Sequence, residues 1–73
     1  MAKQQKVAVS ERALHQRINR KLEADEEVLR KNRVQGYLRI DYRRNALIES
    51  DVDLEQFARK LGVIQPWEEL RAE

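Results

Sequence analysis

The spacing of apolar residues changes at Gly36, and this change limits the chain to a fold that mixes helix and sheet. Before Gly36, the large apolar side chains that fall within one stripe of a helix are Leu14, Ile18, Leu22, Val28 and Leu29. We predict a helix from Ser10 to about Arg33, with Ser10 as its N-cap. The pattern leaves open whether this helix is one rod or breaks near the acidic run Asp25-Glu26-Glu27.

After Gly36 the apolar residues follow the period of a strand. The segment Tyr37 to Tyr42 alternates with period two, so Leu38 and Ile40 are expected on one face together with Tyr42. Ala46-Leu47-Ile48 is predicted as the returning strand, and Arg43-Arg44-Asn45 as the turn, because Asn tolerates the left-handed backbone of short loops. A hairpin alone is marginal in water, so it must pack on a helix or extend a sheet across a dimer.

A second helix is predicted from Leu54 to Leu61. Asp53 is its expected N-cap, and Gly62 its expected left-handed residue after the last turn. Pro66 then predicts the start of a last short helix, in which Trp67 packs and helps to close the core.

The predicted fold class is therefore α+β: a long N-terminal helix, a two-stranded antiparallel hairpin and a short C-terminal helix, assembled as a homodimer. We expect residues 1–9 to be a flexible basic N-terminal arm and residues 10–73 a single small α+β domain. The dimer is expected because a 73-residue chain with no cysteine and one histidine has neither a disulfide nor a zinc-type ligand set to add stability. Association with a second copy buries more apolar area.

Charge is divided unevenly along the chain. Residues 1–44 hold 12 Lys or Arg against 6 Asp or Glu, a net +6, whereas residues 45–73 hold 3 against 7, a net −4. A basic front half is compatible with binding an anionic polymer. No apolar run is long enough to cross a bilayer, and the absence of cysteine fits a reducing compartment, so we expect a cytoplasmic protein.

Basic residues on the first helix and the hairpin are the candidate DNA contacts. On the helix, Arg12, Gln16 and Arg20 recur every fourth residue and share the face turned away from the apolar stripe. Arginines at a hairpin tip can reach a phosphate backbone, and the Gln16 amide can contact base edges. The predicted DNA-binding residues are Arg12, Gln16, Arg17, Arg20, Lys21, Arg39, Arg43 and Arg44. The alternative is that these are solvated faces, balanced by neighbouring acids.

No catalytic or metal-binding pattern accompanies these charges. His15 has no second histidine, cysteine or suitably spaced acid around it. Asp51, Asp53 and Glu55 alternate as in a calcium loop, but the central glycine and the final glutamate of that loop are missing, so helix capping explains them better. We therefore expect a non-enzymatic protein without a metal or cofactor.

Two segments resemble DNA-binding motifs. Phe57 to Val63 resembles the first helix and turn of helix-turn-helix regulators, although the residues that follow, Trp67-Glu68-Glu69, bring acids where that motif faces phosphates. Lys3 to Val9 alternates before Ser10 and resembles the strand of ribbon-helix-helix repressors, which pairs across a dimer.

A resemblance to whole proteins extends over nearly the full chain. The segments that carry it are Tyr37 to Asp41, Asn45 to Ile48, Val52 to Glu55, Leu61 to Val63 and Pro66 to Glu68. They are similar to small proteins encoded on plasmids and integrative elements of proteobacteria, which implies a role in regulating or maintaining such an element. We therefore expect a DNA-binding transcriptional or maintenance regulator whose partners are a second copy of itself and double-stranded DNA. The alternatives are a protein-interaction module without DNA binding, and a domain whose two charge halves attract each other in head-to-tail dimers.

Overall fold

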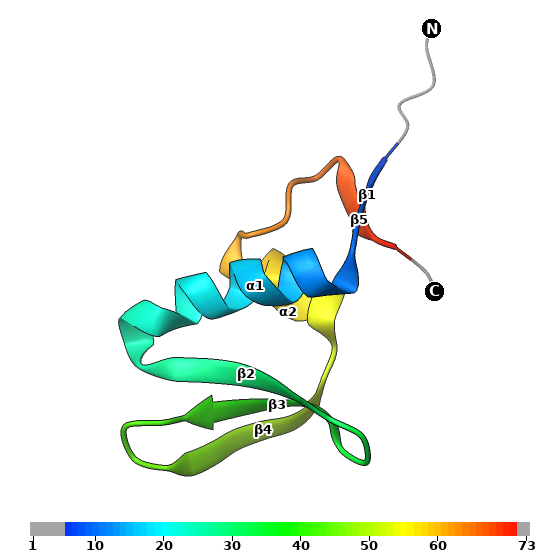
Figure 1. The fold of residues 1–73 in the computed structure, drawn as a ribbon. Coiled ribbons are helices and arrows are strands. Elements are labelled where there is room, and N and C mark those ends of the chain that lie inside the picture. The colour runs from blue at the N-terminus through cyan, green and yellow to red at the C-terminus, as the bar shows by residue number, and fades with distance from the viewer. Residues whose placement is uncertain (1–5, 72–73) are drawn as a thin grey trace, which may run out of the picture.

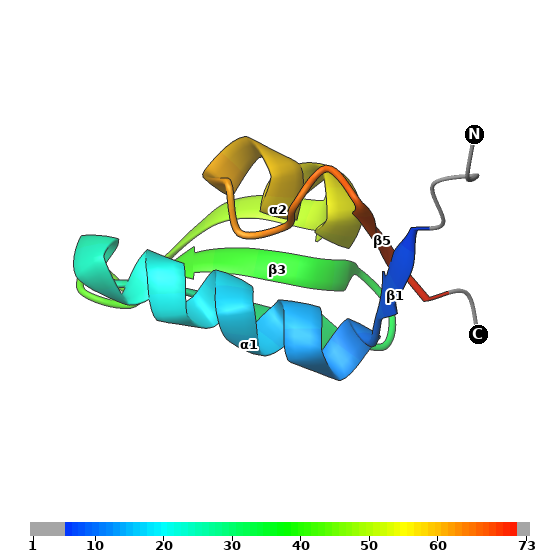
Figure 2. The same ribbon diagram turned by 90° about the horizontal axis from the view of Figure 1, so that it is seen from above.

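The computed structural model describes residues 6–71 as two layers, with both helices lying over one face of a three-stranded sheet (Figures 1 and 2). In chain order the elements are β1 (Val7–Val9), α1 (Glu11–Leu22), the 3-10 helix η1 (Glu23–Asp25), β2 (Glu27–Asn32), β3 (Gly36–Asp41), β4 (Ala46–Val52), α2 (Leu54–Leu61) and β5 (Glu68–Leu70). The antiparallel sheet has the order β2-β3-β4, and β1 pairs in parallel with β5.

The first helix is shorter than predicted. Its start is confirmed, because the Ser10 side chain accepts a hydrogen bond from the Ala13 amide, but α1 ends at Leu22 and residues 27–32 form a strand. After η1, Glu26 takes the left-handed conformation with φ of 58° and reverses the chain. Residues 25 and 26, where the apolar stripe of a longer helix would continue, are acids and resist burial.

The predicted two-stranded hairpin is wrong, because β2 adds a third strand. All of β2 pairs with β3, with Val28 opposite Ile40. The predicted turn between β3 and β4 is present, and Asn45 has the left-handed φ of 54° that it requires. The segment assigned to the end of the first helix thus supplies the additional strand that a marginal hairpin needs.

The predicted second helix is confirmed together with both of its ends. The Asp53 side chain accepts a hydrogen bond from the Gln56 amide at 3.0 Å. Gly62 has a φ of 76°, and the Val63 amide donates back to the Ala58 carbonyl. These signals are local in sequence, so they act whatever the helix packs against.

The predicted short helix after Pro66 is wrong. Glu68–Leu70 is a strand, and its extended backbone directs neighbouring side chains to opposite sides. As a result Trp67 is 58% exposed instead of packing into the core, whereas Glu68 is buried. β1 lies beside this strand, and residues 1–5 of the predicted N-terminal arm lie outside the described residues.

The core lies between the helices and the side of the sheet that faces them. Leu14, Ile18 and Leu22 of α1 meet Leu29 of β2 there, and all four side chains are almost completely buried. We call the opposite side of the sheet the outer face; it carries Val28, Leu38, Ile40 and Leu47. Val28 and Leu38 each neighbour a core residue in their strand, and Ile40 pairs with both Val28 and Leu47 across the strands. Among the described residues, no helix combines the length and apolar character needed to cross a membrane.

Candidate nucleic-acid interface

The outward side of α1 carries a stripe of polar and basic side chains. Arg12, Gln16 and Arg20 are all exposed, and they lie one helical turn apart over about 12 Å. Within the described part of the chain, no acid lies within 4.0 Å of either arginine as an ion pair. Both guanidinium groups are therefore available to an anion from solvent.

Next to this stripe, three basic side chains border an open depression of about 330 Å³. The basic residues are Arg17, Arg20 and Lys21, and Val63, from the segment that follows α2, supplies the opposite wall. Lys21, like Arg20, is exposed and has no ion pair with any acid in residues 6–71. The depression therefore combines concentrated positive charge with access from solvent.

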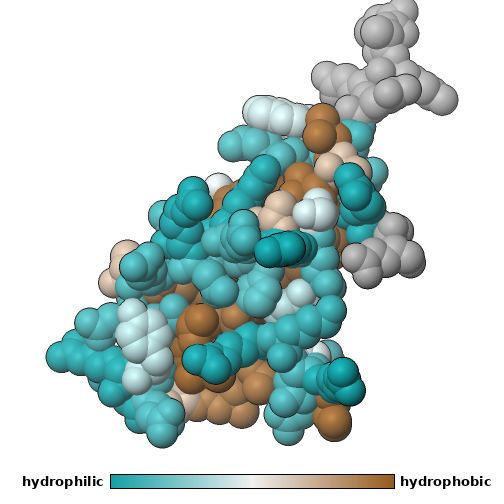
Figure 3. All heavy atoms as spheres, viewed as in Figure 1, coloured by the Kyte–Doolittle hydropathy of each residue, from teal (hydrophilic) through white to brown (hydrophobic). Residues whose placement is uncertain are grey.

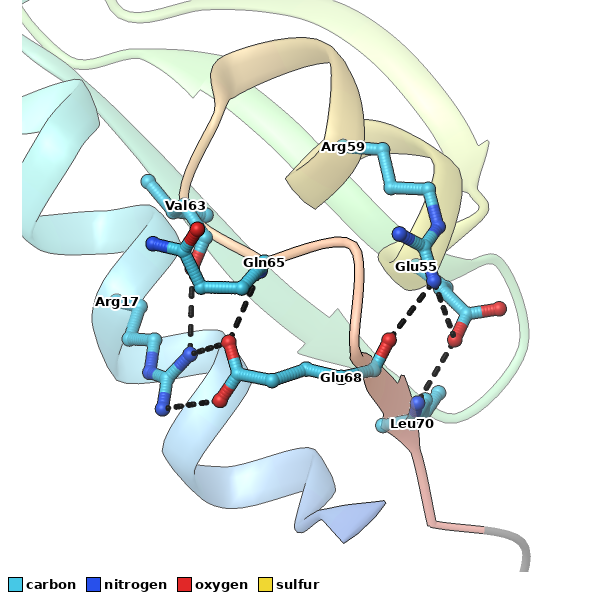
Figure 4. Close-up of polar contacts among 7 residues, drawn as sticks. All are labelled: Arg17, Glu55, Arg59, Val63, Gln65, Glu68 and Leu70. Atoms are coloured by element: carbon cyan, nitrogen blue, oxygen red, sulfur yellow. Dashed lines mark hydrogen bonds and ion pairs between the residues drawn. The ribbon is translucent and has the colours of Figure 1, made fainter. Parts of the chain in front are cut away.

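Arg17 is held in place by the C-terminal strand (Figure 4). Its guanidinium group donates two hydrogen bonds to the Glu68 carboxylate, at 2.9 and 3.1 Å, and one to the Val63 carbonyl at 3.3 Å. The bond from Arg17, helped by the Gln65 amide, lowers the pKa of Glu68, and the same carboxylate raises the pKa of Arg17. Arg17 thus builds the wall of the depression and has its charge already partnered.

Further contacts fix the strand that carries Glu68. Arg59 of α2 donates to the Glu68 carbonyl at 2.9 Å, and the Glu55 carboxylate accepts from the Leu70 amide at 2.7 Å (Figure 4). Because β5 is bound to both helices, the position of Val63 relative to α1 is defined.

The predicted DNA contacts on the hairpin lie elsewhere. Arg39 points toward the helices, where it pairs with Glu27 at 2.6 Å and lies over the Phe57 ring at 5.3 Å. Arg43 and Arg44 are exposed on the turn between β3 and β4, at the end of the molecule where α1 stops (Figure 1). Their ion pairs, at 3.4 Å to Glu26 and 3.9 Å to Asp41, are long and solvent-accessible. The predicted residues therefore form three groups: the α1 surface, the partly buried Arg39 and the turn.

Some polar residues have roles that their sequence positions did not indicate. The side-chain amide of Asn19 bonds both backbone groups of Leu29. His15 is half-buried, with Nε2 against the Leu29 carbonyl and its ring at the edge of Tyr37. The contribution of Val63 to the depression had no sequence signal, because it depends on how the segment after α2 returns to α1.

No cluster of three or more potential metal ligands occurs in the part of the chain that the structure describes. Comparisons with protein-family models, curated proteins and solved structures give no match.

Proposed function

We propose that the chain binds double-stranded DNA through the outward side of α1. The observation that carries the proposal is that Arg12, Arg20 and Lys21 have no acid partner among residues 6–71, although the chain has 13 acids for its 15 Lys and Arg. Basic groups that intramolecular acids do not neutralise are the groups that bind phosphates and release counterions.

The shape of this surface is compatible with a groove. A single α-helix fits the major groove of B-DNA, and α1 is exposed along one side over its 12 residues. Gln16 lies between Arg12 and Arg20, so its amide can reach a base edge while the arginines contact phosphates on either side. The depression beside Arg20 and Lys21 has room for a phosphate group.

The biological role belongs to the same proposal. The resemblance to plasmid-encoded proteins supports a small regulator that acts on, or helps to maintain, a mobile element. Such a regulator needs specific DNA contacts, which is why Gln16 is the residue to test for sequence preference.

The direct test is a fluorescence-anisotropy titration of labelled duplex DNA at about 50 and 200 mM salt. Replacing Arg20 and Lys21 together by alanine should weaken binding and reduce the slope of log K against log salt by roughly 2. The matched control replaces Lys60 and Arg71, two exposed residues without ion pairs to described acids, and removes the same charge. Equal losses in the two variants would mean that net charge, and not α1, determines binding.

The outer face of the sheet favours a second function. Val28, Leu38, Ile40 and Leu47 are apolar side chains outside the core, as expected for a module that binds another protein. No binding of duplex DNA even at about 50 mM salt would contradict the DNA proposal and favour this module.

A further inference from the structure

The two edges of the antiparallel sheet are not equivalent. At the β2 edge, the Asn19 side chain accepts a hydrogen bond from the Leu29 amide at 2.7 Å and donates one to the Leu29 carbonyl at 3.2 Å. His15 contacts the same carbonyl. Side chains of α1 thus occupy the backbone groups of Leu29, through which another strand would pair, and they close this edge near the middle of β2.

The β4 edge is open. Every residue from Ala46 to Asp51 is exposed. The Asp51 amide donates to the Gln35 carbonyl. Within residues 6–71, no other backbone hydrogen bond links this strand to a segment outside the sheet. The pairing with β3 shifts twice, which leaves Ile48 without a partner residue on β3. Unpaired backbone groups on an exposed edge are a template for another strand.

The charges along this edge specify its partner. Arg43 and Arg44 precede β4, Leu47 and Ile48 lie in its first half, and Glu49 and Asp51 lie at its middle and near its end. When two copies of β4 align antiparallel, the basic end of each strand lies beside the acidic end of the other. The dimer therefore contains two such contacts between opposite charges. A parallel alignment would instead place like charges together, which is unfavourable.

We propose that a second copy of this chain pairs with β4 in antiparallel orientation, about a two-fold axis, to form one six-stranded sheet. The contact is isologous, so it uses the same edge of both copies. The only edges left are the two β2 edges, both closed by Asn19 and His15, so assembly stops at two copies. The shifts in β4 limit the new backbone pairing to about residues 46–49, and Arg44, in the turn just before them, then lies close to Glu49 of the other copy.

Pairing at β4 also extends the apolar outer face from one copy to the other. In Figure 3 hydrophobic residues are visible at the lower side of the molecule, where Figure 1 places β3 and β4. Val28, Ile40 and Leu47 form a row across the three strands, and pairing at β4 joins the rows of the two copies into one apolar surface. The helices cover the other side of the sheet (Figure 2).

The first test is the mass of the full chain by sedimentation equilibrium, without DNA, so that it is independent of the proposed function. We expect twice the 8.7 kDa of one chain. Arg44→Glu and Glu49→Lys each place like charges opposite each other in the dimer and should each raise its dissociation constant about tenfold. Mixing the two variants should restore dimerisation, because only the mixed dimer has opposite charges at both contacts. Arg71→Glu, a reversal of an exposed charge beside β1, is the control and should leave the constant within about twofold.

A second variant keeps the test independent of charge. The chain has no cysteine, so Leu47→Cys introduces a single thiol near the proposed axis, where the two copies bring it within disulfide distance. Oxidation should link this variant into a dimer and leave Arg71→Cys unlinked. A monomer at all concentrations, a dimer insensitive to both charge reversals, a mixture that does not recover, or equal linking of the two cysteine variants would each overturn the proposal.

Discussion

The two edge strands of the sheet each carry a leucine, and the two leucines lie in opposite surroundings. Leu29 of β2 is 0% exposed beneath α1, with its backbone bonded to Asn19. Leu47 of β4 is 55% exposed and lies on the outer face. The same side chain on the same sheet is thus core in one strand and surface in the other, because Leu29 lies on the side of the sheet that the helices cover and Leu47 lies on the opposite side.

The largest expected effect comes from truncating these two leucines. Leu29→Ala should lower the free energy of unfolding by about 2–5 kcal/mol, since it leaves a cavity between α1 and the sheet. Leu47→Ala should lower it by less than about 1 kcal/mol. Urea denaturation at low protein concentration measures both values, and equal losses would show that the covered side and the outer face of the sheet do not differ in burial.

Removing the side chain that closes the β2 edge should have an intermediate effect. Asn19→Ala leaves the Leu29 amide without its partner, and we expect a loss of about 1–3 kcal/mol in the free energy of unfolding. Hydrogen exchange at Leu29 should accelerate, whereas exchange along β4 should stay as it was.

Asn19→Asp is the matched control for that variant. Its carboxylate still accepts from the Leu29 amide but cannot donate to the carbonyl, which His15 continues to contact. The loss should therefore be smaller than for alanine. A larger loss for aspartate, or unchanged exchange at Leu29 in the alanine variant, would contradict the view that this amide closes the edge.

The smallest effect concerns how α1 itself is held in place. Arg17 lowers the pKa of Glu68 below its ordinary value of 4.5, so the folded protein binds a proton at this carboxylate more weakly than the unfolded chain does. The stabilisation is present above about pH 4.5 and is lost as the pH falls through the lowered pKa. Lys31 lowers the pKa of Glu11, so this pair also contributes stability that is lost as the pH falls.

Thermal unfolding of the wild-type protein and of Glu68→Gln between about pH 2.5 and 7 measures this dependence. The variant should unfold at a lower temperature at neutral pH and lose less stability on acidification. If the unfolding temperature of Glu68→Gln fell as steeply with acid as that of the wild type, other carboxylates would be responsible for the loss of stability. The acid effect should be seen first in the exchange of amides around α1 and β5, and not along β4.

Local signals predicted the elements whose ends are set by neighbouring residues. Asp53 and Gly62 define α2 in the sequence and in the structure, as Ser10 defines the start of α1. The end of α1 could not be predicted in this way, because Val28 and Leu29 fit the apolar stripe of a helix as well as a strand paired with β3. Pairing with a distant strand decided between them.

The residues of the candidate interface also divide into those placed by local spacing and those placed by tertiary contacts. The exposed stripe of Arg12, Gln16 and Arg20 follows from helical spacing, which is local. The partner of Arg17 is Glu68, 51 residues away, and Arg39 is withdrawn from the surface by Phe57 and Glu27. No spacing rule links residues that meet only when the layers pack.

By itself, the sequence determined where α1 and α2 begin, the turn between β3 and β4 and which side of α1 is basic, because capping, turn conformation and periodicity act over a few residues. The tertiary structure decided that β2 is a strand, that Trp67 is exposed while Glu68 is buried, and that one sheet edge is closed by Asn19 while the other is open. Those outcomes depend on contacts between distant segments, where burial of apolar surface and satisfaction of backbone hydrogen bonds outweigh local preference.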